Sequence, residues 1–269
     1  MKTHTKKYKH SRIKAKLYIA ICIFLAAAIL GIYTIALIFS GNGISLFQKN
    51  AVGSFSATTD LTGLDLSKYP KELAELLSRN PETLDFVKTY PDRDVLCRQT
   101  IDLTDDIASG NVPLFLQWDT RWGYNYYGDE FIAIAGCGPT CLSMAYVFLT
   151  GDTKMNPRIM SEWAYDNGYY SSSGTRWSLW TEGVNKLGLS GCELPLSENV
   201  MKNHLDDGGL IICSMSPGDF TTTGHIILIR GYDENGFYVN DPNSINRSKT
   251  KWSYTVLSKQ IKGLWGISK

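Results

Sequence analysis

One uncharged, apolar run dominates the hydropathy pattern of this chain. It covers residues 17–39, a stretch of 23 positions without a charged side chain. As a helix it would be about 34 Å long at a rise of 1.5 Å per residue, and the hydrocarbon core of a bilayer is about 30 Å thick. A cleaved signal peptide would have a shorter apolar run of roughly 7–15 residues and a small-residue cleavage site. The pattern therefore predicts an uncleaved transmembrane helix.

Basic residues before this run predict its orientation. Residues 1–16 hold seven Lys or Arg side chains and no acidic residue. Because positive flanks stay on the cytoplasmic side, we expect a cytoplasmic tail at 1–16, a single-pass signal anchor at 17–39, and an extracellular domain beyond the cell membrane. There, 20 basic residues face all 26 acidic ones, a net charge of −6. This balance argues against a nucleic-acid partner, which requires a basic surface.

A polar spacer and two short helices are expected after the anchor. Residues 40–68 are rich in Gly, Ser, Thr and Asn, a composition typical of a flexible spacer. Residues 69–90 predict two short helices, because apolar side chains recur at helical spacing and Pro70 and Pro81 suit first helical turns. We interpret residues 69–110 as a helical neck, or as an extension packed on the main domain, without chemistry of its own.

The pattern changes from helical to strand-like within the main domain, residues 111–269. Apolar periodicity and glycine stop signals predict helices over 138–150, 156–167, 175–187 and 197–207. Extended segments are expected at 113–117 and 189–194. Strand-like runs follow at 210–214, 225–232 and 237–241, the last two joined by a turn at Glu234-Asn235-Gly236. Helices first and an antiparallel sheet second predict an α+β fold.

Cys137 has the sequence surroundings of a nucleophile. It lies in Gly136-Cys137-Gly138-Pro139, where Pro139 favours a first helical turn and the glycines allow close approach of a substrate to the backbone. The N–H groups and dipole of a helix N-terminus stabilise a thiolate, the reactive form of cysteine. The alternative is a buried inert thiol, which suits Cys141, one turn deeper in the apolar helix.

Elimination identifies a candidate base for this thiolate. Of the four histidines, two lie in the predicted cytoplasmic tail and His204 lies in a polar helix, whereas His225 opens an apolar strand. A structural core histidine is the alternative for His225. A third group normally orients such a base. Asp241 ends the next strand and is the candidate if a bulge or twist brings it to His225, and Asn240 stays open as a competitor.

Gln117 is a candidate electrophilic group. Its side-chain amide would join backbone N–H groups near Cys137 in stabilising the negative charge on an attacked carbonyl. A polar residue at a strand end is the alternative.

The remaining cysteines suggest no metal site. Five cysteines follow the predicted anchor, and an odd number leaves at least one free thiol. The sequence leaves open whether Cys192 and Cys213 form a disulfide. The absence of a C-x-x-C pair argues against a zinc knuckle, and we expect no cofactor and no metal ion.

Four motifs, taken in their order along the chain, resemble the C39-like peptidase family, which has a papain-like fold. They are Gln117-Trp118-Asp119-Thr120-Arg121-Trp122-Gly123, Gly136-Cys137-Gly138-Pro139-Thr140, Gly224-His225 and Asn240-Asp241-Pro242. The resemblance covers about residues 111–269. It implies a cysteine peptidase with Gln117 as oxyanion donor, Cys137 as nucleophile, His225 as base and Asp241 as orienting acid. The best-known members trim bacteriocin leader peptides in the cytoplasm, fused to an ABC transporter, whereas this chain has no nucleotide-binding motif.

The sequence thus supports the hypothesis of a membrane-anchored, extracytoplasmic cysteine peptidase that acts on a peptide or protein substrate. Two alternatives stay open. One is a cell-wall peptide amidase or acyl transferase on the same fold, and the other is a peptide-binding module without catalytic activity. The sequence indicates neither the cleavage preference nor the oligomeric state.

Overall fold

The computed structural model describes residues 63–269, so the predicted tail, the anchor and most of the spacer lie outside the described residues. Residues Leu64–Lys269 form one compact unit, which includes the segment 69–110 that we interpreted as a neck or extension. Within residues 63–269, no helix is both long enough and apolar enough to cross a membrane.

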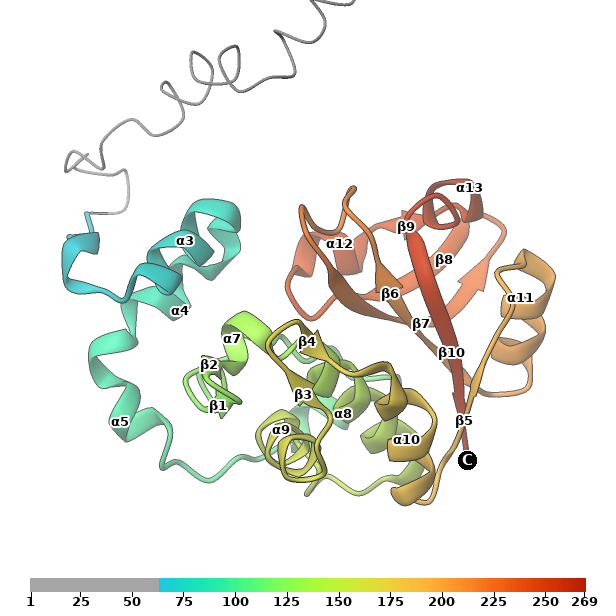
Figure 1. The fold of residues 1–269 in the computed structure, drawn as a ribbon, viewed down its shortest axis with the longest axis horizontal. Coiled ribbons are helices and arrows are strands. Elements are labelled where there is room, and N and C mark those ends of the chain that lie inside the picture. Colours follow the sequence, from blue (N-terminus) through green and yellow to red (C-terminus); the bar gives the residue numbers. More distant parts are fainter. Residues whose placement is uncertain (1–62) are drawn as a thin grey trace, which may run out of the picture. The chain divides into compact units, whose positions relative to one another are not determined.

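The helices fall into two groups, one before the predicted main domain and one within it (Figure 1). The first group is η1 (Leu66–Lys68), α3 (Lys71–Arg79), η2 (Pro81–Thr83), α4 (Leu84–Lys88), η3 (Tyr90–Asp92), α5 (Arg93–Leu96) and α6 (Thr104–Ile107). The second is α7 (Ile132–Ala135), α8 (Cys137–Thr150), α9 (Pro157–Asp166), η4 (Trp177–Trp180), α10 (Glu182–Lys186), α11 (Glu198–Asp206), α12 (Ile245–Lys249) and α13 (Tyr254–Leu257). The helices predicted near 69–90, 138–150, 156–167 and 197–207 are confirmed.

The strands form one large antiparallel sheet and two small hairpins. The hairpins are β1 (Tyr126–Tyr127) with β2 (Glu130–Phe131), and β3 (Tyr170–Ser171) with β4 (Gly174–Thr175). The sheet has the order β5-β10-β6-β7-β8-β9. Its strands are β5 (Ser190–Glu193), β6 (Leu210–Met215), β7 (His225–Asp233), β8 (Gly236–Asn240), β9 (Lys251–Trp252) and β10 (Ile261–Ser268).

Alternating side chains give this sheet a core on each face. Successive residues of a strand point to opposite faces, so Ile212 and Leu228 join the core formed with α8, α9 and α10. Ile211 and Ile227 join a second core with α11 and α13. Figure 1 shows α8–α10, in green to yellow, gathered beside the orange and red strands. The sheet is therefore buried on both faces, which fixes the ends of β7 and β8 firmly.

One predicted helix differs from the structure, and one strand was not predicted. The helix expected over 175–187 is interrupted, because η4 buries the adjacent side chains of Leu179 and Trp180 and α10 begins only at Glu182. The segment 113–117, which was expected to be extended, is buried at Phe115 and is not part of the sheet. Strand β10, which lies between β5 and β6, was not predicted at all.

Candidate active site

Cys137 is the first residue of α8, as predicted. Gly136 precedes it as the N-cap residue and continues from the short helix α7. A Cβ atom on Gly136 would lie 2.5 Å from Ile132, and one on Gly138 would lie 2.4 Å from Thr175. These two glycines are therefore required for close packing around the cysteine. The Cys137 side chain itself is half-buried.

A cleft of about 730 Å³ opens beside Cys137. Its walls include Cys137, His225, Thr175, Trp177 and Lys262, so it is bounded by the start of α8 on one side and by the sheet on the other. Cys137 on α8 and His225 on β7 are far apart in the sequence, but the fold brings the candidate nucleophile and the candidate base to the same cleft.

His225 is the first residue of β7 and is almost fully buried. Its Nε2 lies 2.7 Å from Oδ1 of Asp241, so Nδ1 is the ring nitrogen left for the thiol of Cys137. Burial lowers the pKa of His225, but the charge and hydrogen bond of Asp241 and a hydrogen bond with Cys137 together raise it to about 10. The imidazole is thus held as a cation, the form that stabilises a neighbouring thiolate.

Asp241 is completely buried, and its carboxylate accepts three hydrogen bonds. The donors are Nε2 of His225 at 2.7 Å, the backbone N–H of Asn243 at 2.8 Å and Nε of Arg247 at 2.5 Å. Burial raises the pKa of this carboxyl group, but His225 and Arg247 lower it below its ordinary value. Asp241 is therefore ionised and fixes the orientation of the imidazole ring.

The two candidates for the third group, Asp241 and Asn240, have different hydrogen-bond partners. Asn240 donates from Nδ2 to the carbonyl of Pro113 at 2.9 Å and accepts from Nε of Arg230 at 2.9 Å. Among the described residues, Asn240 forms no hydrogen bond with His225, whereas Asp241 does. The register of β7 and β8 shifts between Ile229 and Gly231, which is the kind of irregularity we expected the pairing to need.

Gln117 is not among the residues that line the cleft. Its Nε2 donates to the carbonyl of Ala133 at 2.7 Å and its backbone N–H donates to the carbonyl of Pro242 at 2.7 Å. The side chain is buried, and among the described residues its Oε1 has no hydrogen-bond partner. Gln117 therefore links the turn before Cys137 to the loop after Asp241.

Comparison with known proteins identifies the family of this chain. The model of the Peptidase_C39 like family matches residues 109–269. The chain belongs to this family. A crystal structure from Bacillus anthracis, described as that of a candidate C39-like peptidase, is similar at a TM-score of 0.36 and 16% identity, over 60% of this chain and 96% of that one. No curated protein matches the chain.

Arg247 is a member of this C39-like site that the sequence did not reveal. It lies in α12, six residues after Asp241, with Nε 2.5 Å from the second carboxylate oxygen. In the sequence, Arg247 is only a basic residue a few positions after Asp241-Pro242. Such a pattern is common in surface turns. Its role depends on how the loop folds back, and that is not a local property of the sequence.

The other cysteines of this C39-like domain have structural positions. Cys141 is buried, its Sγ donates to the carbonyl of Ile226 at 3.5 Å, and burial raises its pKa. The disulfide between Cys192 and Cys213, which the sequence left open, does not form: both thiols are free. They lie in β5 and β6, on either side of β10, so about 9.6 Å separates their strands, and a disulfide requires Cα atoms within about 7 Å.

Proposed function

We propose that this protein is a membrane-anchored, extracytoplasmic cysteine peptidase. One observation carries the proposal: Cys137 begins a helix at a cleft beside His225, and His225 is hydrogen-bonded at 2.7 Å to the buried Asp241. Membership of the Peptidase_C39 like family supports a peptide or protein as the substrate.

The arrangement suits acyl transfer through a thioester. The thiolate of Cys137 attacks the peptide carbonyl carbon, and the protonated His225 gives its proton to the leaving amine. His225 then takes a proton from water, the resulting hydroxide attacks the thioester, and the carboxylic acid leaves as the thiolate is restored. Asp241 keeps the ring in one orientation throughout.

Charge that develops on the carbonyl oxygen requires nearby donors. The N–H groups at the start of α8 are one source. Gln117 is the other, because Nε2 carries two hydrogens and only one is held at a short distance, by Ala133. Nε2 also lies 3.4 Å from the carbonyl oxygen of Ile134, a contact long enough to be exchanged for a substrate oxygen.

The predicted tail at 1–16 and anchor at 17–39 support the location of the enzyme on the outer surface of a cell membrane. A single-pass protein in this orientation loses its domain, but keeps its tail, when intact cells are treated with an external protease. A tail that is digested under the same conditions would contradict this orientation.

The cleft lining favours one second candidate, an amidase or acyl transferase acting on cell-wall peptides. Five of the residues that border it carry hydroxyl groups, namely Ser173, Thr175, Ser214, Ser216 and Thr223, and Lys262 adds a positive charge. Such a lining suits a polar, carboxylate-bearing substrate. Cleavage of peptidoglycan stem peptides, with folded and unfolded proteins left intact, would favour this function.

The first test is labelling of the full-length protein with an iodoacetamide or epoxide reagent over a range of pH. We expect rapid modification at Cys137, located by mass spectrometry, and its loss in Cys137→Ala. The matched control is Cys141→Ala, which removes a buried thiol on the same helix and leaves the labelling intact. Modification of Cys137 no faster than that of a free thiol, or unaffected by His225→Ala, would overturn the proposal.

A further inference from the structure

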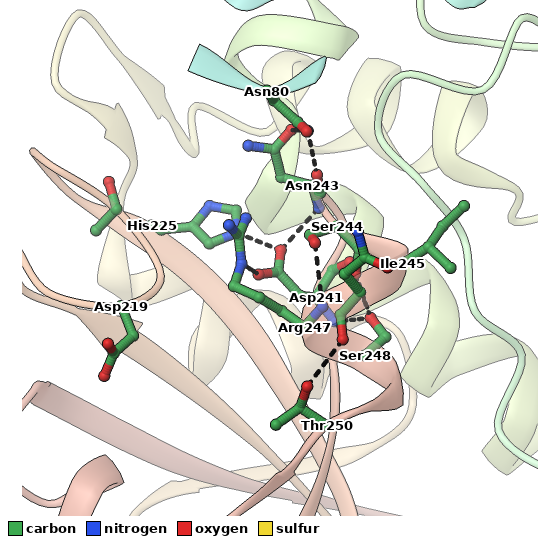
Figure 2. A network of polar contacts seen from close by, with 12 residues as sticks. Asn80, Asp219, His225, Asp241, Asn243, Ser244, Ile245, Arg247, Ser248 and Thr250 are labelled. Atoms are coloured by element: carbon green, nitrogen blue, oxygen red, sulfur yellow. Dashed lines mark hydrogen bonds and ion pairs between the residues drawn. The ribbon is translucent and has the colours of Figure 1, made fainter. Parts of the chain in front are cut away.

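The segment before the family match contacts the loop that follows Asp241. Asn80 donates from Nδ2 to the carbonyl of Asn243 at 2.5 Å and to its Oδ1 at 3.2 Å. Figure 2 shows Asn80 beside Asn243, at the edge of the group that surrounds Asp241 and His225. Residues far apart in the sequence therefore meet next to the candidate catalytic acid.

Glu82 adds a second connection to the same loop. Its Oε1 accepts from Oγ of Ser244 at 2.5 Å, and its Oε2 accepts from the backbone N–H groups of Ile245 at 2.8 Å and Asn246 at 3.3 Å. These N–H groups belong to the first turn of α12, where helical carbonyl partners are lacking. The carboxylate thus fixes the start of the helix that carries Arg247.

The loop transmits this restraint to the Asp241 carboxylate. The backbone N–H of Asn243 lies 2.8 Å from Oδ1, and Nε of Arg247 lies 2.5 Å from Oδ2. Ser248 accepts the backbone N–H of Asp241 at 2.8 Å. Two of the three hydrogen-bond donors to the carboxylate therefore come from the segment that Asn80 and Glu82 hold.

The segment that carries Asn80 and Glu82 is itself firmly packed. Its helices α3 and α4 form an apolar cluster that includes Phe86, Tyr124 and Ala133. The rings of Phe86 and Tyr124 stack with centroids 4.2 Å apart, and Ala133 lies in α7, immediately before Cys137. The segment thus contacts both the turn before the nucleophile and the loop after the acid.

We propose that Asn80 and Glu82 are positioning residues of the peptidase, which hold the 243–247 loop so that Asp241 stays on His225. The segment from Leu64 is then a working part of the enzyme, although the family match begins only at residue 109. This inference rests on the proposed function, because positioning has a consequence only if Cys137 and His225 react.

The test compares Glu82→Gln with Glu72→Gln in the full-length protein. Glutamine keeps the shape of Glu82 but loses the negative charge and one acceptor oxygen, whereas Glu72 is exposed in α3 of the same segment. The readout is the rate of Cys137 alkylation as a function of pH, with Asp241→Asn as reference. Melting temperature is measured in parallel, because a merely structural residue would change it without changing the pH profile.

We expect Glu82→Gln to slow alkylation by about 10- to 100-fold, the cost of a small misplacement of reacting groups, and to move the pH profile toward that of Asp241→Asn. Glu72→Gln should match the wild type. If Glu82→Gln does not fold, Asn80→Ser is used, since serine can still cap the 3-10 turn but loses the amide bound to Asn243.

Two results would overturn the inference, and they are distinguishable. A wild-type profile in Glu82→Gln, with rapid and His225-dependent labelling, would remove the positioning role and leave the proposed function standing. Slow, His225-independent labelling of the wild type itself would overturn the proposed function and this inference together.

Discussion

The two sides of the candidate site are held in different ways. On the nucleophile side, tight backbone packing around Gly136 and Gly138 places Cys137, and its side chain borders the open cleft. On the acid side, Asp241 is completely buried and its orientation is set by hydrogen bonds from three separate residues. Packing thus fixes the position of the thiol, whereas a polar network fixes the orientation of the Asp241 carboxylate.

This difference predicts different sensitivities to mutation. A buried carboxylate is stable only while its partners remain, and removal of one partner leaves an uncompensated charge. Changes as far along the chain as Glu82 and Arg247 should therefore affect the acid side. The nucleophile side should respond mainly to changes in volume, because close-packed groups tolerate added atoms poorly.

The largest effect is expected from Asp241→Asn, which disrupts the polar network at its centre. The substitution removes the charge that holds His225 as a cation and leaves Arg247 without its counter-ion. Loss of the orienting acid in a comparable triad costs about 10,000-fold in turnover. We expect a loss of about 1,000- to 10,000-fold in kcat, measured on a peptide substrate of the wild-type enzyme.

The control for this variant is Asp233→Asn, at the other end of β7. Asp233 forms an ion pair with Lys251 on the surface, so its neutralisation should leave kcat within about twofold of the wild type. Equal activity of the two variants would show that the polar network around Asp241 has no part in the reaction.

The sequence predicted the nucleophile side better than the acid side, for a physical reason. Cys137 has local signals, since a proline at the first helical turn and two glycines lie within two residues of it. The choice of Asp241 over Asn240 depends on the register shift after Ile229, which the sequence of one strand does not reveal. A helix N-terminus at Cys137 was predicted, and so was the pairing of Asp241 with His225, but the other two donors to Asp241, Asn243 and Arg247, were not.

Residues that act over long sequence separations were missed for the same reason. Glu82 was included in a neck without chemistry, and its partner Ser244 lies 162 residues later. Strand β10 was missed because Gly263 and Gly266 weaken its strand pattern, although it pairs with both β5 and β6. The existence of local elements could be predicted, whereas contacts between them could not.

A smaller effect is expected from Gln117→Ala, which tests the link between the two sides. The substitution removes the proposed donor to the carbonyl oxygen of the substrate and also the hydrogen bond to Ala133. We expect kcat to fall about 10- to 1,000-fold with little change in KM, since loss of one oxyanion donor has an effect of about 100- to 1,000-fold where that donor is fully engaged.

The matched control is Gln99→Ala, which changes an exposed glutamine outside the site. An unchanged kcat in Gln117→Ala would assign oxyanion stabilisation to the backbone of α8 alone. Because the carbonyl of Ala133 loses a donor, the variant should also be less stable by about 1–3 kcal/mol, and both rates are therefore measured well below its melting temperature.

The smallest and most specific effect concerns the pH dependence of stability. The pKa of His225 rises from 6.5 to about 10 on folding, so the folded state binds more protons than the unfolded state between these values. The stabilisation is complete below about pH 6.5 and is lost as the pH rises toward 10, because stability falls with pH wherever the folded state holds more protons.

The neutral variant His225→Gln lacks this contribution at every pH. Urea unfolding at pH 6 and pH 9 should therefore show a difference between wild type and variant that shrinks at the higher pH. The buried thiol of Cys141 is present in both proteins, so its titration cancels in that difference. A difference that stays constant across this range would mean that His225 is neutral when folded, and the ion pair on the acid side would then be wrong.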